Sequence, residues 1–137
     1  MNRPQVFTWP IRVYWEDTDA GGIVFYANYL KFFERARTEW LRSLGVSQGA
    51  LKEDGGGMFV VSETSVRYLQ PSRLDDELLV TAQLEAGGRA SLIIAQRALR
   101  GGTVLCEGTI RIGWVDAATL RPARIPGAIL EVLNTKA

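Results

Sequence analysis

One strongly aromatic helix constrains the fold of this chain more than any other feature. At about 100° per residue, apolar side chains between residues 25 and 44 fall on a continuous arc of about 120°. The arc contains Phe25, Tyr29, Phe32, Phe33, Ala36, Trp40 and Leu44, with Leu30 and Leu41 at its margins. Each buried ring contributes about 1.5–3 kcal/mol, so this face needs a large partner surface such as a sheet. The sequence predicts a helix over residues 28–45 that lies across strands, with a distorted first turn from Ile23 and Gly45 as its stop.

Most of the remaining chain has the pattern of strands. Apolar runs bounded by turn residues predict strands at residues 7–15, 58–69, 77–86, 89–100 and 103–115. The pairs Gly87-Gly88 and Gly101-Gly102 separate the last three strands, and adjacent glycines accept the positive φ angles of tight hairpins. These three strands should therefore form an antiparallel meander. Pro10 cannot donate to a ladder, so the first strand should lie at an edge or carry a bulge.

The order of these elements, a strand, a helix and then four strands, indicates an α+β fold. We expect a curved antiparallel five-stranded sheet wrapped around one long helix, with a short helix after Pro126. A chain of 137 residues has the length of one domain, so residues 1–137 should form a single unit.

Composition and charge exclude several classes of protein. Hydrophobic residues make up 47% and charged residues 23%, a balance typical of a soluble globular chain, and no apolar stretch is long enough for a transmembrane segment. Sixteen basic and 15 acidic side chains leave a net charge of +1 without a basic run, so we expect no nucleic-acid partner. Residues 1–5 are not followed by the apolar segment of a signal peptide, which favours the cytoplasm.

The chain has no histidine and a single cysteine, Cys106. Imidazole is therefore missing as a metal ligand, a general base and a member of a catalytic triad, which excludes Ser-His-Asp and Cys-His hydrolysis. Ordinary zinc sites are excluded with them, and we expect no metal site. A catalyst built on this chain must use carboxylates, hydroxyls, backbone amides or a bound cofactor.

Carboxylates are concentrated just before the predicted helix. Glu16, Asp17 and Asp19 lie within four residues and precede the pair Gly21-Gly22. Helix capping explains one acid at such a place, but three would repel one another, and this excess favours a functional interpretation. Glycines let the backbone approach a ligand, and the unpaired amides of a helix start can stabilise an oxyanion. An acid beside such donors is the outline of a hydrolytic site, with capping as the alternative.

Residues 14–30, with the sequence YWEDTDAGGIVFYANYL, and residues 33–37, FERAR, resemble the signature of a known family. It is the 4-hydroxybenzoyl-CoA thioesterase family of hotdog-fold acyl-CoA thioesterases. The chain is most similar to its Tol-Pal-associated subgroup, through TEWLR at residues 38–42, and RYLQPSRLDDEL at residues 67–78 is also similar to the family. The resemblance implies a hotdog fold and an enzyme that hydrolyses acyl-CoA to a carboxylic acid and free CoA. It implies no metal or prosthetic group, with CoA entering as part of the substrate.

The resemblance also assigns roles to residues. Asp19 becomes the catalytic carboxylate, acting as a nucleophile or as a general base, and Asp17 supports it. Tyr26 occupies the position whose backbone amide helps to hold the thioester carbonyl, where many members of the subgroup have histidine. The pair Gly21-Gly22 shapes the turn. Asn28 either caps the helix or orients the substrate.

Other polar residues are weaker candidates. Ser65 is expected to line the pocket. Arg89, Ser91 and Arg97, on the hairpin after Gly87-Gly88, are candidates for contact with the CoA phosphates, because arginine offers a bidentate fork. Solvated turn charge is at least an equal alternative. For Glu34 and Arg37 on the helix, a structural or interfacial salt bridge is favoured over catalysis.

Hotdog proteins usually join two sheets, with the sites at the interface, so the resemblance implies a homodimer or homotetramer. An acyl carrier protein or envelope-linked proteins are further expected partners. The main alternative is a non-catalytic module that binds acyl-CoA or an acyl carrier protein. A lyase of the same fold is a third reading, but known hydratases use a His-Asp pair, and this chain has no histidine.

Overall fold

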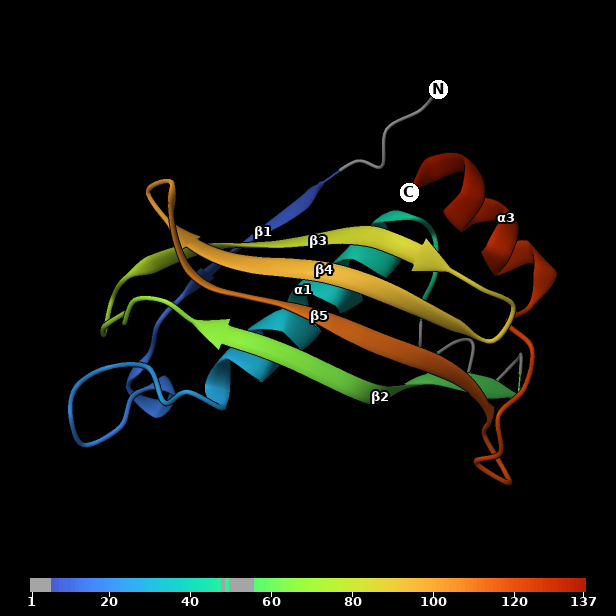
Figure 1. Ribbon diagram of the computed structural model, residues 1–137, viewed down its shortest axis with the longest axis horizontal. Helices are drawn as coiled ribbons and strands as arrows, with labels where there is room; N and C mark the ends of the chain where they lie inside the picture. The colour runs from blue at the N-terminus through green and yellow to red at the C-terminus, as the bar shows by residue number, and fades with distance from the viewer. Residues whose placement is uncertain (1–5, 48, 50–55) are drawn as a thin grey trace.

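The computed structural model describes residues 6–47, 49 and 56–137, so the sequence features of residues 1–5 lie outside the described part. Five antiparallel strands form one sheet in the order β1-β3-β4-β5-β2 (Figure 1). The strands are β1 (Phe7–Arg12), β2 (Gly57–Tyr68), β3 (Glu77–Gly87), β4 (Ser91–Arg100) and β5 (Thr103–Asp116). The predicted meander of β3, β4 and β5 is confirmed, and β1, which contains Pro10, is an edge strand as expected.

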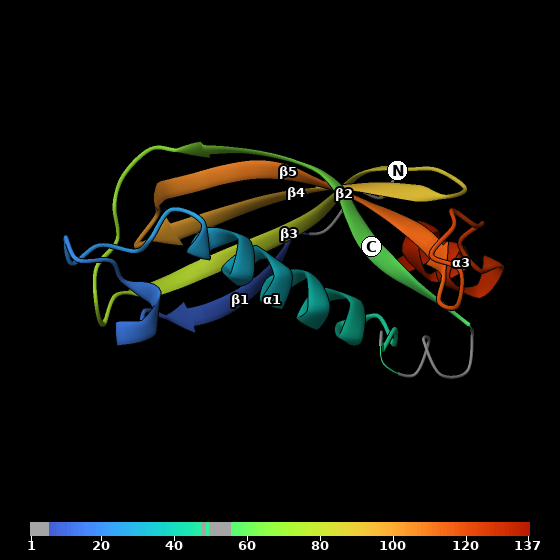
Figure 2. The ribbon, with the colours of Figure 1, turned by 90° about the horizontal axis from the view of Figure 1, so that it is seen from below.

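The helix α1 (Asn28–Ser43) lies across one face of the curved sheet (Figure 2). Its buried side chains on the predicted arc are Tyr29, Phe32, Phe33, Ala36, Trp40 and Leu41. They pack against inward-facing residues of β3 and β4 such as Val80 and Ile94, neither of which is exposed. Gly45, with φ of 85°, follows the helix end, which confirms the predicted stop because this angle strains residues with a Cβ.

Two predictions of buried side chains are wrong, one within the arc and one at its margin. Phe25 and Leu30 were expected on the buried face, but they are 46% and 41% exposed. Phe25 precedes α1 and belongs to the loop that starts it, where its amide donates to the Asp17 carbonyl. The helical periodicity therefore does not apply to it.

The first strand is shorter than the expected residues 7–15. Residues Trp15–Asp17 form the 3-10 turn η1, and Trp15 is 81% exposed. The Tyr14 amide donates to the Asp17 carboxylate and not to a neighbouring strand. A local side-chain acceptor thus replaces the ladder and ends β1 early.

The two glycine hairpins differ. Gly101 and Gly102 have φ of 55° and 88°, as expected for a tight turn. Gly87 and Gly88 do not have positive φ, and the Gly88 amide donates to the Ser91 carbonyl across a wider turn. Arg89 therefore belongs to this turn, and β4 begins two residues later than predicted.

The strand β2 forms the other edge of the sheet and pairs with β5. Its side chains from Val61 to Ser65 are exposed on both faces. The short helix expected after Pro126 is present as α3 (Gly127–Lys136), which buries Ile129 and Leu133. Within residues 6–47, 49 and 56–137, no helix combines the length and apolar character needed to cross a membrane.

Candidate active site

The acidic segment folds into a tight loop between β1 and α1. We call this connection, residues 13–27, the acidic loop. The Asp19 amide donates to the Ile23 carbonyl at 2.9 Å, and the Gly22 amide donates back to the Asp19 carbonyl at 3.0 Å. Thr18 and Val24 form a bridge just outside this turn. Gly22 has φ of 79°, so the turn uses the conformational freedom that its sequence offers. The loop thereby brings Asp19 close in the fold to the segment that starts α1.

Asp19 is exposed, and its carboxylate folds over its own turn. Oδ1 accepts a hydrogen bond from the Gly21 amide at 2.8 Å. A Cβ on Gly21 would lie 3.2 Å from this oxygen, so glycine provides the room for the carboxylate. Within the described chain, Oδ2 has no hydrogen-bond donor. One carboxylate oxygen is thus oriented by the backbone while the other is available for chemistry.

Asp17 points the other way and is buried, with 3% of its surface exposed. Its Oδ2 accepts from the Tyr14 amide and its Oδ1 accepts from Nδ2 of Asn28, both at 2.8 Å. Asn28 is buried as well, and no side-chain hydrogen bond caps α1, so the predicted capping role of Asn28 is wrong. The two residues instead tie the beginning of the loop to the first residue of the helix.

The Tyr26 amide lies two residues before the first residue of α1. The amides of Phe25 and Asn28 donate to carbonyl oxygens within the loop. In the part of the chain that the structure describes, the amides of Tyr26 and Ala27 have no acceptor. Because these N–H groups lie next to the positive end of the helix dipole, they can donate to a negatively charged oxygen.

An aromatic groove lies beside Tyr26. A cavity of about 240 Å³ is lined by Ile23, Tyr26, Tyr29, Tyr68, Leu69 and Pro71, among others. The ring of Tyr26 lies 5.9 Å from that of Tyr68 at 90°, and Tyr68 also contacts the ring of Tyr29. Burial raises the pKa values of Tyr29 and Tyr68, so both remain neutral near pH 7. The groove is suited to an uncharged, largely apolar group.

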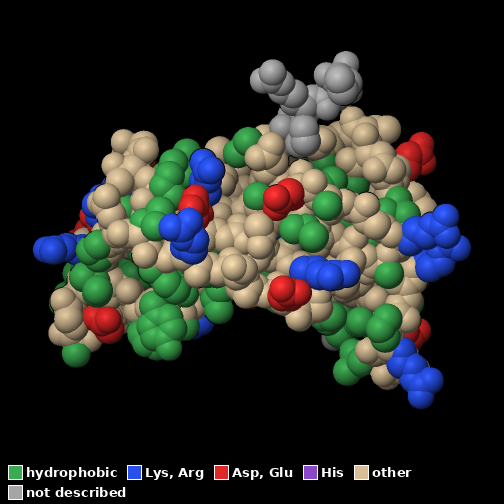
Figure 3. Space-filling view, viewed as in Figure 1, with side chains coloured by type: hydrophobic (Ala, Val, Ile, Leu, Met, Phe, Trp, Pro, Cys, Tyr) green, Lys and Arg blue, Asp and Glu red, His purple; other side chains and the backbone are tan. Residues whose placement is uncertain are grey.

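The weaker candidates, with Arg97 beside Ser65 in one cavity, do not gather at the acidic loop. Ser65 is exposed on β2 and lines a different cavity, of about 470 Å³, on the outer face of the sheet. Figure 3 views this face, where side chains of both charge signs are interspersed. Arg89 and Ser91 lie at the hairpin between β3 and β4, at the opposite end of the sheet from the acidic loop (Figure 1).

Arg37 is buried, at 9% exposure, with a neutral partner in place of the expected carboxylate. Its Nη1 donates to Oε1 of Gln96 at 2.9 Å, and Nε2 of Gln96 donates to the Phe33 carbonyl at 3.0 Å. Burial lowers the pKa of Arg37, against the opposing influence of Glu34. Among the described residues, no ion pair joins Arg37 to a carboxylate.

Sequence reasoning also missed the contact between Tyr29 and Ser72, whose hydroxyls share a buried hydrogen bond of 2.6 Å. Tyr29 was predicted as an apolar core residue. The hydroxyl of a buried tyrosine indicates that a hydrogen-bond partner must be present, but the periodicity of the sequence does not show which residue provides it.

Among the described residues, no group of three or more Cys, Asp or Glu side chains is arranged so that it could hold a metal ion. The loop does offer the exposed Asp19 carboxylate and the unpaired Tyr26 amide. Together they can attack, or assist attack on, a carbonyl carbon while its oxygen is held.

Known proteins are similar to this chain in sequence and in fold. Residues 13–133 match the thioesterase-like superfamily. The chain is 41% identical over 120 residues to the acyl-CoA thioesterase YbgC of Haemophilus influenzae, covering 88% of each chain. It is 41% identical over 126 residues to the acyl-CoA thioester hydrolase YbgC of an Escherichia coli strain, covering 91% of this chain and 93% of that one.

Solved structures agree with the sequence comparison. A probable thioesterase from Bartonella henselae superposes with a TM-score of 0.84 at 29% identity, covering 89% of this chain and all of that one. A 1,4-dihydroxy-2-naphthoyl-CoA thioesterase from Synechocystis has a TM-score of 0.87 at 19% identity, covering 96% of this chain and 98% of that one, which supports the fold alone. The expected hotdog fold is confirmed, and the chain belongs to the thioesterase-like superfamily.

Proposed function

We propose that this protein is a hydrolase that cleaves acyl-CoA thioesters to a free carboxylic acid and CoA. The observation that carries the proposal is that the loop between β1 and α1 holds both an exposed carboxylate, Asp19, and an unpaired amide, that of Tyr26. Relatives that are 41% identical over most of their length are named acyl-CoA thioesterases, which supports the same substrate class here.

The reaction begins with the thioester carbonyl oxygen accepting a hydrogen bond from the Tyr26 amide. Asp19 then either attacks the carbonyl carbon, giving a mixed anhydride that water hydrolyses, or removes a proton from a water that attacks directly. The C–S bond breaks and the sulfur leaves as thiolate, which takes up a proton from solvent. A thiol pKa of about 8.5 makes this departure easy without a strong general acid.

The remaining residues of the loop act by positioning. Asp17 and Asn28 hold the two ends of the loop together through their mutual hydrogen bond at 2.8 Å. Gly21 orients the Asp19 carboxylate through its amide, and Gly22 allows the turn. No resident cofactor takes part in this scheme, since CoA arrives as part of the substrate.

The active form is a homodimer or a homotetramer. The strand β2 is long and exposed, and its outer edge is unpaired within the described chain, as expected of a strand that joins a second sheet. Exposed Tyr68 and Leu69 beside the groove supply apolar surface for the contact. A second subunit would also cover Asp19 and allow its own Ser65, Arg89 and Ser91 to reach CoA.

The resemblance to the Tol-Pal-associated subgroup supports a cytoplasmic enzyme. It also supports an interaction with envelope-linked proteins or with an acyl carrier protein. These partners do not change the chemistry at Asp19.

A panel of acyl-CoA substrates, assayed by release of free thiol, tests the proposal. Burial raises the pKa of Cys106 to about 12, so the protein's own thiol stays protonated and does not add to the signal. We expect turnover of at least one acyl class and a loss of about 10²-fold or more in Asp19→Asn. Glu16→Gln, a change of an exposed acid in the same loop, is the matched control and should stay within about twofold of wild type.

Equal and negligible hydrolysis by wild type and Asp19→Asn across all acyl chain lengths would contradict the proposal that the protein is a thioesterase. Binding of a non-hydrolysable acyl-CoA analogue in the same proteins, measured by calorimetry, would then identify a non-catalytic binding module.

A further inference from the structure

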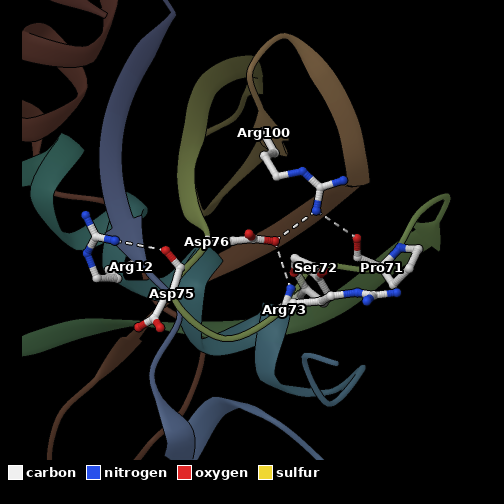
Figure 4. Close-up of polar contacts among 8 residues, drawn as sticks. Arg12, Pro71, Ser72, Arg73, Asp75, Asp76 and Arg100 are labelled. Atoms are coloured by element: carbon white, nitrogen blue, oxygen red, sulfur yellow. Dashed lines mark hydrogen bonds and ion pairs between the residues drawn. The ribbon is translucent and has the colours of Figure 1, made fainter. Parts of the chain in front are cut away.

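A second loop lies against the acidic loop, and an ion pair bridges its two ends. We call residues 71–76, which connect β2 to β3, the brace loop (Figure 4). Nη1 of Arg100, at the end of β4, donates to Oδ2 of Asp76 at 2.8 Å and to the Pro71 carbonyl at 3.2 Å. The same oxygen of Asp76 accepts from the Arg73 amide at 2.9 Å. One guanidinium nitrogen thus joins the first and last residues of the brace loop.

The brace loop contacts the acidic loop after Asp19. The Val24 amide donates to the Ser72 carbonyl at 2.8 Å, and Ile23 forms a bridge with Arg73. Oγ of Ser72, a fully buried residue, shares its 2.6 Å hydrogen bond with Tyr29 in the first turn of α1. These contacts lie on both sides of Tyr26, whose amide is the proposed oxyanion donor.

The brace loop also contacts the chain ahead of Asp17. The Val13 amide donates to the Asp76 carbonyl and the Asp75 amide donates to the Val13 carbonyl, both at 2.9 Å. Asp75 has φ of 70°, which is unusual for a residue with a side chain and is kept only where the surroundings hold it. Nη1 of Arg12 accordingly donates to the Asp75 carbonyl at 2.8 Å. The brace loop therefore contacts the acidic loop at both of its ends, at Val13 and at Ile23 and Val24.

The ion pair is too exposed to act mainly through stability. The side chains of Arg100 and Asp76 are 39% and 26% exposed, and such surface pairs contribute little to the free energy of folding. Their geometry is more specific, since two backbone groups of the brace loop share the same two side chains. A small displacement of a catalytic group costs much more in rate than in stability.

We propose that Asp76 and Arg100 are positioning residues of the thioesterase, which fix the brace loop and through it the placement of Asp19 and the Tyr26 amide. The proposal rests on the proposed function. It assigns to the connection between β2 and β3 a role in catalysis without contact with the reacting atoms.

The test compares Arg100→Gln and Asp76→Asn with Arg42→Gln. Arg42 lies on the surface of α1 and pairs with Glu39 at 2.9 Å, so it is a matched arginine in an ion pair without contact to the brace loop. We expect Arg100→Gln and Asp76→Asn to lower kcat about 10-fold with KM within about twofold, and Arg42→Gln to change neither. Arg100→Lys should recover part of kcat, because its ammonium can reach Asp76 without the fork of arginine.

Two further measurements separate this proposal from the proposed function. Hydrogen exchange of the Val24 amide, followed without substrate, should be faster in Arg100→Gln than in Arg42→Gln. In an Asp19→Asn background, Arg100→Gln should lower the residual rate by clearly less than 10-fold, because only the contribution of the Tyr26 amide is left to lose. Unchanged Val24 exchange in Arg100→Gln, or equal kcat in Arg100→Gln and Arg42→Gln, would overturn the positioning role. If Val24 exchange is faster in Arg100→Gln but Asp19→Asn keeps full turnover, the result would support the role of Arg100 in fixing the brace loop and reject Asp19 as the catalytic residue.

Discussion

Nδ2 of Asn28 donates to Oδ1 of Asp17 at 2.8 Å, and this bond joins the first residue of α1 to the end of the 3-10 turn eleven positions earlier. Both residues are buried, and the other oxygen of Asp17 accepts from the Tyr14 amide. Among the described residues the carboxylate is thus enclosed with two donors and no cation, so its role is to close the loop while Asp19, two residues later, faces outward.

Replacing Asp17 by Ala should therefore destabilise the fold strongly. The change leaves the buried Asn28 side-chain amide and the partly buried Tyr14 amide without an acceptor, which costs about 2–4 kcal/mol. Urea unfolding followed by tryptophan fluorescence measures the loss. Glu16→Ala, one position earlier but exposed, should change the free energy of unfolding by less than about 0.5 kcal/mol. Similar values for the two variants would show that Asp17 does not close the loop.

The two glycines of the turn should respond differently to alanine. A Cβ on Gly21 meets Oδ1 of Asp19 at 3.2 Å, so Gly21→Ala displaces the carboxylate, and we expect turnover to fall about 10-fold with little change in melting temperature. Gly22 has open space around it but φ of 79°, so Gly22→Ala should lower the free energy of unfolding by about 1 kcal/mol. Thiol-release kinetics and thermal melts of both variants check this contrast. A Gly21→Ala enzyme with normal turnover would show that the orientation of Asp19 by this turn is unimportant.

The stability of the brace loop should depend on pH through Asp76. Partial burial opposes its ionisation, but the Arg73 amide and the Arg100 guanidinium outweigh this and lower the pKa of Asp76 below its ordinary value. Because the folded pKa is the lower one, the stabilisation is fully present above the unfolded value of about 3.9 and is lost as pH falls through the folded pKa. Wild type should thus exceed Asp76→Asn in free energy of unfolding at pH 7, and the difference should shrink below pH 4. A difference that stays constant down to pH 2.5 would contradict this linkage.

Elements set by local sequence were predictable. The aromatic arc, the stop at Gly45 and the tight turn at Gly101-Gly102 depend on residues within one or two turns of one another, and the structure confirms all three. Phe25 fits the same periodicity but precedes the helix, because the chain there bonds to the acidic loop. Periodicity alone does not mark this boundary.

The candidate site was predictable as a segment but not as a geometry. Repulsion among Glu16, Asp17 and Asp19 was the sign of function in the sequence, yet the fold turns Asp17 inward and Asp19 outward. The partners that orient the loop come from distant segments, since Tyr29 and Ser72 lie 43 positions apart. Only tertiary structure brings such pairs together, and no spacing rule within the chain encodes them.

The stability of the core should depend on the hydrogen bond between Arg37 and Gln96. Gln96→Leu removes the acceptor of a buried guanidinium, so we expect a loss of about 2–3 kcal/mol in the free energy of unfolding. Combining it with Arg37→Met removes the charge as well, and the double variant should regain most of this loss, since an apolar pair of similar size fills the same space. Urea unfolding of the two single variants and the double variant measures the coupling. Additive losses would mean that Arg37 is stabilised by groups other than Gln96.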